Sequence, residues 1–441
     1  MKTPSQKNQT KSSSNNKLNI FYWTLFDFAN TSFSIVVVTF LFAVYFKETV
    51  AGGEPVGDLY WSFGTSSAML ITALISPVLG AIADYSAGRK RFLLFFTLLC
   101  IVPTSLLYFI EAGHVLSGII LFVIASIGFE AGLVFYDAFL PDITTSKNYG
   151  RVSGYGYGMG YIGSLAVLFI CFPFIENNMI KETFPIAALF FLIFSIPFFI
   201  FIKDNRKPVQ KSQITFISIG IKRVANTVKN LPQYKNLALF LLAFFFYIEG
   251  VNTVIFFSGN YASTTLKFSN NELIVFFIIV QSTAIFGSII FGIIADSYGQ
   301  KKSILLSLYI WIFTMIVAFV TSDQTSGLMQ SLAVEFETDI FELAKKSFYI
   351  VGLLAGSVMG ATQSVSRSFM SKLTPENKKT EFFGFYSFFG KSSAIVGPLV
   401  FGLISYITES QRIAILSLTL FFIIGIILLK FVKDEVVSQT S

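Results

Sequence analysis

Long apolar segments alternate along the chain with short polar stretches, and few charges interrupt the apolar runs. Many of these runs are about 20 residues long, and a helix of that length crosses about 30 Å of hydrocarbon. The pattern therefore predicts membrane-spanning helices. Twelve spans are expected, near residues 20–46, 58–82, 92–112, 115–140, 151–175, 183–202, 236–260, 271–295, 303–322, 346–371, 380–407 and 411–432.

The predicted spans fall into two groups of six. The expected fold is therefore an all-α polytopic membrane protein with two pseudo-symmetric six-helix bundles, at residues 18–202 and 236–433. Residues 1–17 are rich in Ser, Asn, Gln and Lys and have little apolar surface to bury, which predicts a disordered tail. A second short tail is expected at 434–441.

The linker at 203–235 has a pattern of its own. Apolar residues recur three and four positions apart between Ile214 and Leu231, with Lys222, Arg223 and Lys229 between them. This pattern predicts an amphipathic helix that rests on the inner membrane surface or on the helix bundle. A packed connector is the simpler interpretation, and a regulatory site is the alternative.

Composition narrows the function classes. Apolar residues make up 54% of the chain and charged residues only 13%, whereas soluble proteins have about a quarter charged. Two separated cysteines and one histidine, His114, cannot assemble a thiol or histidine metal site and make a His-based triad unlikely. The sequence therefore predicts no enzyme, metal or cofactor.

One glycine pattern matches a cofactor motif. Gly158-Met-Gly160-Tyr-Ile-Gly163 has the spacing of a dinucleotide fingerprint, but no strand precedes it. Close helix packing is the better interpretation. The chain also lacks the glycine-rich phosphate loop that ATP-driven transport would need.

The basic residues predict orientation. The formal net charge is +7, and most Lys and Arg residues fall in loops on the side of the N-terminus. This asymmetry predicts that both termini are cytoplasmic, and it explains the positive charge without nucleic acid as a partner.

A polar segment occurs twice, at matching places in the two halves. Gly80-Ala-Ile-Ala-Asp84-Tyr-Ser-Ala-Gly88-Arg89-Lys90 follows the second span, and Gly292-Ile-Ile-Ala-Asp296-Ser-Tyr-Gly299-Gln-Lys301-Lys302 follows the eighth. A repeated hinge is typical of a transporter whose halves rock against each other. The carboxylates can cap backbone amides and pair with the basic residues, and Gly80 and Gly292 permit close helix approach. The alternative is that the basic residues only fix orientation.

These segments resemble the loop signature of the major facilitator superfamily, although one extra residue separates Asp84 from Gly88 and Gln300 replaces an arginine. Further segments are similar to the vacuole-effluxer branch, the autophagy-related permeases that export amino acids from the fungal vacuole, and their bacterial relatives. They are Phe26-Asp27-Phe28-Ala29-Asn30-Thr31-Ser32-Phe33, Phe135-Tyr136-Asp137-Ala138-Phe139-Leu140-Pro141, Gly360-Ala-Thr-Gln363-Ser-Val-Ser-Arg367-Ser, Glu381-Phe-Phe-Gly384-Phe-Tyr386 and Gly390-Lys391.

The resemblance spans Phe21 to Lys430 and implies the major facilitator fold. It also implies a gating role for Asp84, Arg89, Asp296 and Lys301, with Gly80, Gly88, Gly292 and Gly299 completing the two loops. The short loops look bacterial rather than fungal, which implies a bacterial plasma membrane.

Six charged residues lie within the predicted spans at three or more positions from either end, and four polar residues accompany them. At the bilayer centre such a charge costs about 2.5–3.5 kcal/mol, so each is expected to face a cavity or a partner. Glu249-Gly-Val-Asn252-Thr253 also echoes Asp27-Phe-Ala-Asn30-Thr31. The candidate substrate or proton pathway is Asp27, Asn30, Glu130, Tyr136, Asp137, Glu249, Asn252, Gln363, Arg367 and Lys391.

The first half supplies three of these acids, and the second half supplies one acid and two bases. A zwitterion such as an amino acid would fit across that division, with its carboxylate toward Arg367 or Lys391. The alternative is that the six groups pair with one another. Because a buried carboxyl group that loses its partner can take up a proton, Glu130 and Glu249 are the candidates for proton coupling.

The expected function is secondary transport of a small organic solute, with an amino acid as the first candidate, by alternating access. The transport would be proton-coupled or run downhill as export, and one chain has enough helices to act as a monomer. The alternatives are a transporter-like receptor or scaffold without turnover, and efflux of drugs or other metabolites.

Overall fold

The computed structural model describes residues 4–53, 55–204, 216–323 and 325–434. Within them, 12 helices are long and apolar enough to cross a membrane, as the sequence predicts. The first six spans are α1 with η1, α2 and η2 (Lys17–Val50), α3 (Val56–Ser86), α4 with η3 (Arg89–Phe109), α5 (Val115–Asp137), η4 with α7 (Ser146–Glu176) and α8 (Thr183–Phe201). The second six are η5 with α10 (Leu231–Thr264), α11 (Asn270–Tyr298), α12 (Gln300–Thr321), α14 (Ile340–Leu373), η6 with α15 (Glu376–Thr408) and α16 with α17 (Gln411–Phe431).

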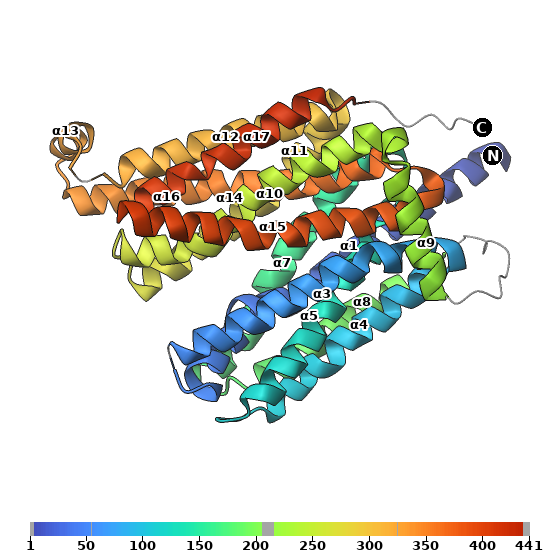
Figure 1. Ribbon diagram of the computed structural model, residues 1–441, viewed down its shortest axis with the longest axis horizontal. Helices are drawn as coiled ribbons and strands as arrows, with labels where there is room; N and C mark the ends of the chain where they lie inside the picture. Colours follow the sequence, from blue (N-terminus) through green and yellow to red (C-terminus); the bar gives the residue numbers. More distant parts are fainter. Residues whose placement is uncertain (1–3, 54, 205–215, 324, 435–441) are drawn as a thin grey trace.

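The spans form two bundles, each with its own core (Figure 1). One cluster of buried apolar side chains comes from α1 to α8, and the other comes almost entirely from α10 to α17. The part of the chain that the structure describes contains no strand. The all-α fold with two six-helix bundles is therefore confirmed.

The bundles meet along two helix pairs, α3 with α15 and α7 with α11. We call these the first seam and the second seam. A Cβ atom on Gly80 would lie 2.2 Å from the Thr380 carbonyl oxygen, and one on Gly292 would lie 2.5 Å from that of Gly150. Glycine is therefore needed at both positions for the helices to approach this closely.

Both seams are closed at the same end of the molecule. Lys379, at the start of α15, forms a 3.1 Å ion pair with Asp142, which lies in the short helix α6 (Leu140–Ile143) just before α7. We call this the motif end, because Asp84 and Asp296 lie there. Figure 1 shows the ribbons of the two bundles diverging toward the other end, where α13 (Gly327–Glu335) lies.

The polar contacts between the halves agree with that shape. Within the described residues, the hydrogen bonds and ion pairs between the two bundles join residues that lie between the middle of a span and its motif end. The structure is therefore of a conformation closed at the motif end.

The linker contains α9 (Phe216–Lys229), which crosses the ends of the spans at the motif end (Figure 1). Residues 205–215 of the linker and 435–441 of the C-terminal tail lie outside the described residues. Helix α1 begins at Pro4 and ends at Phe33, so residues 4–17, for which the composition predicts a disordered tail, continue the first span as helix. The segment after Pro4 contains no Gly or Pro that would end a helix.

Candidate functional site

Arg367 of α14 joins the two bundles. One of its terminal nitrogens, Nη1, lies 3.1 Å from Asp27 Oδ2 of α1 and 3.0 Å from Asp137 Oδ1 at the end of α5. Its other nitrogens donate to Ser153 of α7, from Nε to the hydroxyl oxygen and from Nη2 to the carbonyl oxygen, at 2.9 Å each. The second half thus supplies one cation to two acids of the first half.

Aromatic rings enclose this cluster. The Arg367 guanidinium lies 4.7 Å from the ring centroid of Trp23 and 4.3 Å from that of Tyr157. Its side chain is only 2% exposed, and all three guanidinium nitrogens already have protein partners. In this conformation Arg367 therefore bridges the two halves through buried contacts.

A second ion pair links the bundles nearby. Lys391 Nζ of α15 lies 2.5 Å from Glu130 Oε2 of α5. The Lys391 side chain is 26% exposed, whereas that of Glu130 is 9% exposed. This pair is consequently the more exposed of the two.

Glu249 of α10 differs from the other ionisable residues in the spans. It is fully buried, and its Oε1 accepts a hydrogen bond from the Gly397 backbone of α15. Within the described residues, its Oε2 has no hydrogen-bond partner and no cation pairs with it. Five of the six intramembrane charges are therefore paired with one another, and Glu249 is a carboxyl group without a cation.

The four polar candidates lie close to these charges. Tyr136 donates to the Trp23 carbonyl oxygen at 2.9 Å and stacks on the Trp23 ring, which supports the wall of the Arg367 cluster. Gln363 of α14 accepts from Tyr161 of α7, in the opposite bundle, at 3.0 Å. Asn252 contacts Ser393 at 3.4 Å, and the buried Asn30 has an Nδ2 without a hydrogen-bond partner among the described residues.

The two aspartates of the repeated loop make equivalent contacts across the seams. Asp84 accepts the backbone N–H of Glu381, at the start of α15, at 2.8 Å. Asp296 accepts those of Gly150 and Arg151, at the start of α7, at 2.7 Å and 3.0 Å. Each carboxylate thus satisfies free donors at the start of a helix in the opposite bundle, where the helix dipole also favours negative charge.

The basic residues of the loops have other partners. Arg89 donates to the carbonyl oxygen of Ala138 and to the carboxylate of Asp142, both within the first half. Lys301 donates to the carbonyl oxygens of Lys430 and Val432, at 2.7 Å and 2.6 Å. Lys301 therefore binds the end of α17 in its own half, and Asp296 pairs instead with Arg151 of the opposite half.

The loop glycines differ in backbone conformation between the two halves. Gly299 has φ +99° and joins α11 to α12, a conformation that favours glycine. In the first half the positive φ falls on Ala87, at +51°, while Gly88 has φ −106°. The extra residue between Asp84 and Gly88 accounts for that shift.

Several partners of the site were missed from the sequence. They are Ser153 and Arg151 on α7, Asp142 before it, and the side chain of Glu381 on α15. A signal exists for Asp142, Arg151 and Glu381 but not for Ser153, because the same interval separates Asp142 from Lys372, Arg151 from Glu381 and Asp204 from Asp434. Aligning the halves at that interval places each of these residues at a repeated position.

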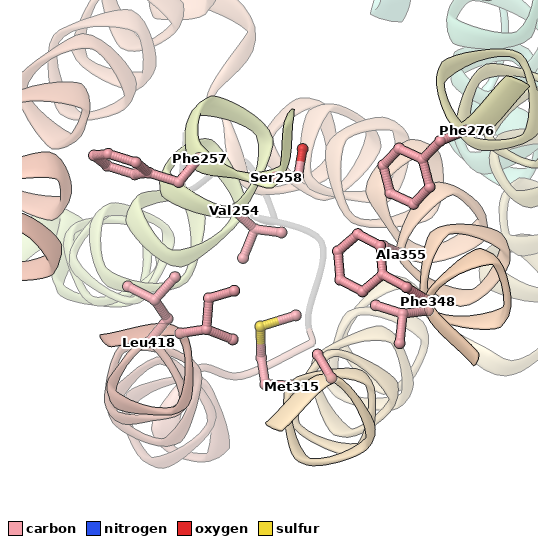
Figure 2. Close-up of a pocket in the computed structure, with 11 residues that line it drawn as sticks. Val254, Phe257, Ser258, Phe276, Met315, Phe348, Ala355 and Leu418 are labelled. Atoms are coloured by element: carbon pink, nitrogen blue, oxygen red, sulfur yellow. The ribbon is translucent and has the colours of Figure 1, made fainter. Parts of the chain in front are cut away.

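One apolar cavity lies away from these charges. It is inside the second bundle, and Figure 2 shows Phe257, Met315, Phe348 and Leu418 around it, with the Ser258 hydroxyl as its one labelled polar group. No charged residue lines it, and it does not touch a seam. Among the described residues, no group of three or more His, Cys, Asp and Glu side chains could hold a metal ion.

Comparison with known proteins shows the family of this chain. A family model described as "Vacuole effluxer Atg22 like" matches residues 60–438. The chain is 33% identical over 433 residues to the MFS-type transporter YxiO of Bacillus subtilis (strain 168), covering 95% of this chain and 96% of that protein. It is 26% identical over 299 residues to autophagy-related protein 22 of Kluyveromyces lactis, covering 65% of this chain and 58% of that protein.

A solved structure shares the fold. The major facilitator superfamily proton:xylose symporter XylE, bound to 6-bromo-6-deoxy-D-glucose, superposes with a TM-score of 0.72 at 13% identity, covering 96% of this chain and 97% of that chain. The repeated loop, the two bundles and these matches agree with the resemblance seen in the sequence. The chain is an integral membrane protein that belongs to the Atg22-like vacuole effluxer family of major facilitator superfamily transporters.

Proposed function

We propose that this transporter moves a small organic solute, with amino acids as the first candidates, by alternating access between the two bundles. The observation that carries the proposal is the pair of charge clusters between the halves, Arg367 with Asp27 and Asp137, and Lys391 with Glu130. Charges within a membrane are costly unless they serve a pathway or a partner. Both clusters bridge the surfaces that must separate when the motif end opens.

The two clusters suit different roles. Arg367 is saturated with protein contacts, so we assign it to the latch that holds the motif end closed. Lys391 and Glu130 form the accessible pair, so we assign them to the solute. The carboxylate of an amino acid would take Lys391, and its ammonium group would take Glu130, with little net change in buried charge.

Glu249 is our candidate for proton coupling, with Glu130 as the second. A buried carboxyl group with no cation can hold a proton in one conformation and release it when the other conformation hydrates it. Glu249 accepts its hydrogen bond from Gly397 of α15, the helix that also carries Lys391. Protonation of Glu249 would therefore act on the same helix that binds the solute.

The proposed orientation of the protein in the membrane follows from the basic loops. We propose that the motif end is cytoplasmic, with both termini there, as the distribution of Lys and Arg predicts. The conformation described here is then open to the outside, and the chain functions in a bacterial plasma membrane. Labelling that places Lys90 and Lys301 on opposite sides of the membrane would overturn this topology.

The first experiment is thermal unfolding of the purified protein across a panel of metabolites that includes the amino acids. A ligand that binds only the folded protein raises the melting temperature by mass action. We expect shifts with one or more amino acids, and a loss of those shifts in Lys391→Gln. Shifts confined to drugs or sugars would overturn the amino-acid assignment, and binding without uptake in vesicles would favour a receptor.

The second experiment separates proton coupling from solute binding. In vesicles, Glu249→Gln is expected to abolish uptake driven by a pH gradient and to leave solute exchange intact, because the amide keeps the shape but cannot titrate. Glu130→Gln is expected to reduce both, because it also unpairs Lys391. If pH-driven uptake and exchange survive in both variants, proton coupling through these residues is wrong.

A further inference from the structure

Helix α9 is held firmly against the bundles at the first seam. Gly220 packs against Val78 and Ile82 of α3, where an added Cβ would approach within 2.9 Å and 2.8 Å of their side chains. On the other side of the seam, Thr227 donates to the buried carboxylate of Glu381, and Arg223 Nε lies 3.5 Å from it. The linker helix thus contacts both bundles at once.

The sequence of α9 gives the helix four distinct sides, because residues seven apart lie on the same side of a helix. Gly220 and Thr227 face the bundles and are buried. Ile221 and Val228 form one edge, and Lys222 and Lys229 form the side turned away from the bundles. The opposite edge is polar and carries Asn226 and Asn230.

The apolar edge is not covered by any described part of the protein. Ile221 and Val228 are each 54% exposed, and Leu231, just beyond the helix, is 45% exposed. Lys222 and Lys229 are exposed beside them. A fixed helix with one apolar edge, one basic side and one polar edge has the pattern of a helix that lies in a membrane surface.

The position of α9 agrees with that surface. Figure 1 shows α9 running crosswise to the spans at the motif end, which is how a helix lying along the surface would run. Lysine stems can lie along apolar surface while their ammonium groups reach lipid phosphates. The two lysines therefore favour anionic over zwitterionic lipid headgroups.

We propose that α9 binds the anionic lipid surface through Ile221, Val228, Lys222 and Lys229 while its other face straps the first seam. Opening of the motif end must separate α3 from α15, so it must release one of the two contacts of α9. Anionic lipid that holds α9 in place therefore stabilises the closed motif end. This inference is independent of which solute is carried.

The test uses the full-length protein with an environment-sensitive fluorophore on Val228→Cys or, as the matched control on the opposite edge, Asn226→Cys. The native Cys100 and Cys171 are both buried, and the unsubstituted protein reports any background labelling. Each sample is placed in phosphatidylcholine nanodiscs with or without phosphatidylglycerol, and quenching by lipid carrying a nitroxide is measured. We expect quenching at Val228→Cys to exceed that at Asn226→Cys by at least about two-fold.

Phosphatidylglycerol is expected to increase quenching at Val228→Cys. The double substitution Lys222→Gln/Lys229→Gln should remove that increase, because each lysine lost should lower the affinity of α9 for the anionic membrane by about five-fold. The control Lys147→Gln/Lys302→Gln, at exposed positions outside α9, should keep it. Equal quenching on both edges overturns the membrane contact, and quenching that ignores phosphatidylglycerol overturns the role of the lysines. Ile221→Cys repeats the measurement if Val228→Cys fails to fold.

Discussion

At the first seam Asp84 accepts a backbone N–H from Glu381, and at the second seam Asp296 accepts two, from Gly150 and Arg151. Arg151 and Glu381 occupy corresponding positions in the two halves, so the duplicated geometry is the same while the charge is reversed. Arg151 also pairs with Asp296 through its side chain at 2.8 Å. Glu381 instead adds a second acid beside Asp84.

The linker helix contributes to balancing this reversed charge. Glu381 is fully buried, and its nearest cations are Arg223 of α9 at 3.5 Å and Lys378 at 3.6 Å. A buried carboxylate needs such partners, because the desolvation penalty is otherwise uncompensated. The second seam therefore holds its own charges in balance, whereas the first seam takes one of its two cations, Arg223, from a segment outside both bundles.

The largest expected effect comes from removing the cations of the first seam. Arg223→Met with Lys378→Met leaves Glu381 buried without a cation and should destabilise the closed motif end by about 3 kcal/mol. The measurement is the alkylation rate of Ser76→Cys, a buried position at the first seam, which should rise on the order of 100-fold.

Arg151→Met is the matched control at the second seam. It should destabilise the closed end by only about 1 kcal/mol, because Arg151 is 42% exposed and Asp296 keeps its two backbone donors. Equal effects of the two variants would contradict the difference between the seams.

The next effect tests what the seams share. Gly80→Ala and Gly292→Ala should each destabilise the closed motif end by about 1–3 kcal/mol, because each Cβ would meet a backbone carbonyl oxygen across its seam. The same alkylation assay should show similar increases for both. Gly402→Ala, in α15 with open space around it, should be neutral or slightly stabilising. A large effect at only one seam would show that the seams do not close together.

A smaller difference concerns the loops that precede α7 and α15. Asp142 pairs with Arg89 in its own half and with Lys379 in the other half, whereas its counterpart Lys372 contacts Gln300 and Asp434, both in its own half. Asp142→Asn should therefore destabilise the closed end by about 1 kcal/mol, since Asp142 is partly exposed. Lys372→Gln should lower the melting temperature slightly and leave the alkylation of Ser76→Cys unchanged.

The sequence was sufficient for the spans and for the duplication. Length and hydropathy alone locate a membrane helix, and the repeated Gly80 and Gly292 segments mark equivalent turns. The same information listed the charges within the spans. It could not pair them, because Arg367 reaches Asp27 and Asp137 only through the rotation and packing of helices far apart in the chain.

The partners of the loop residues were beyond the sequence for a similar reason. The resemblance implies a gating role for Lys301 because of its position in the loop motif. The extra residue before Gly88 makes Lys90, and not Arg89, the counterpart of Lys301. Lys90 donates to the carbonyl oxygen of Ile202 at the end of α8, as Lys301 does at the end of α17. Recognising that equivalence requires the helix ends as well as the motif.

The smallest expected effect follows from that equivalence. Lys90→Gln and Lys301→Gln should each destabilise the protein by about 0.3–1 kcal/mol, because each removes a cation from the carbonyl end of the last helix in its own bundle. Neither should change the alkylation of Ser76→Cys, since neither lysine makes a contact across a seam. The melting temperature and the alkylation rate together separate these roles. Faster alkylation in Lys301→Gln alone would restore the gating role that the motif implies for Lys301 and would make the two halves unequal here as well.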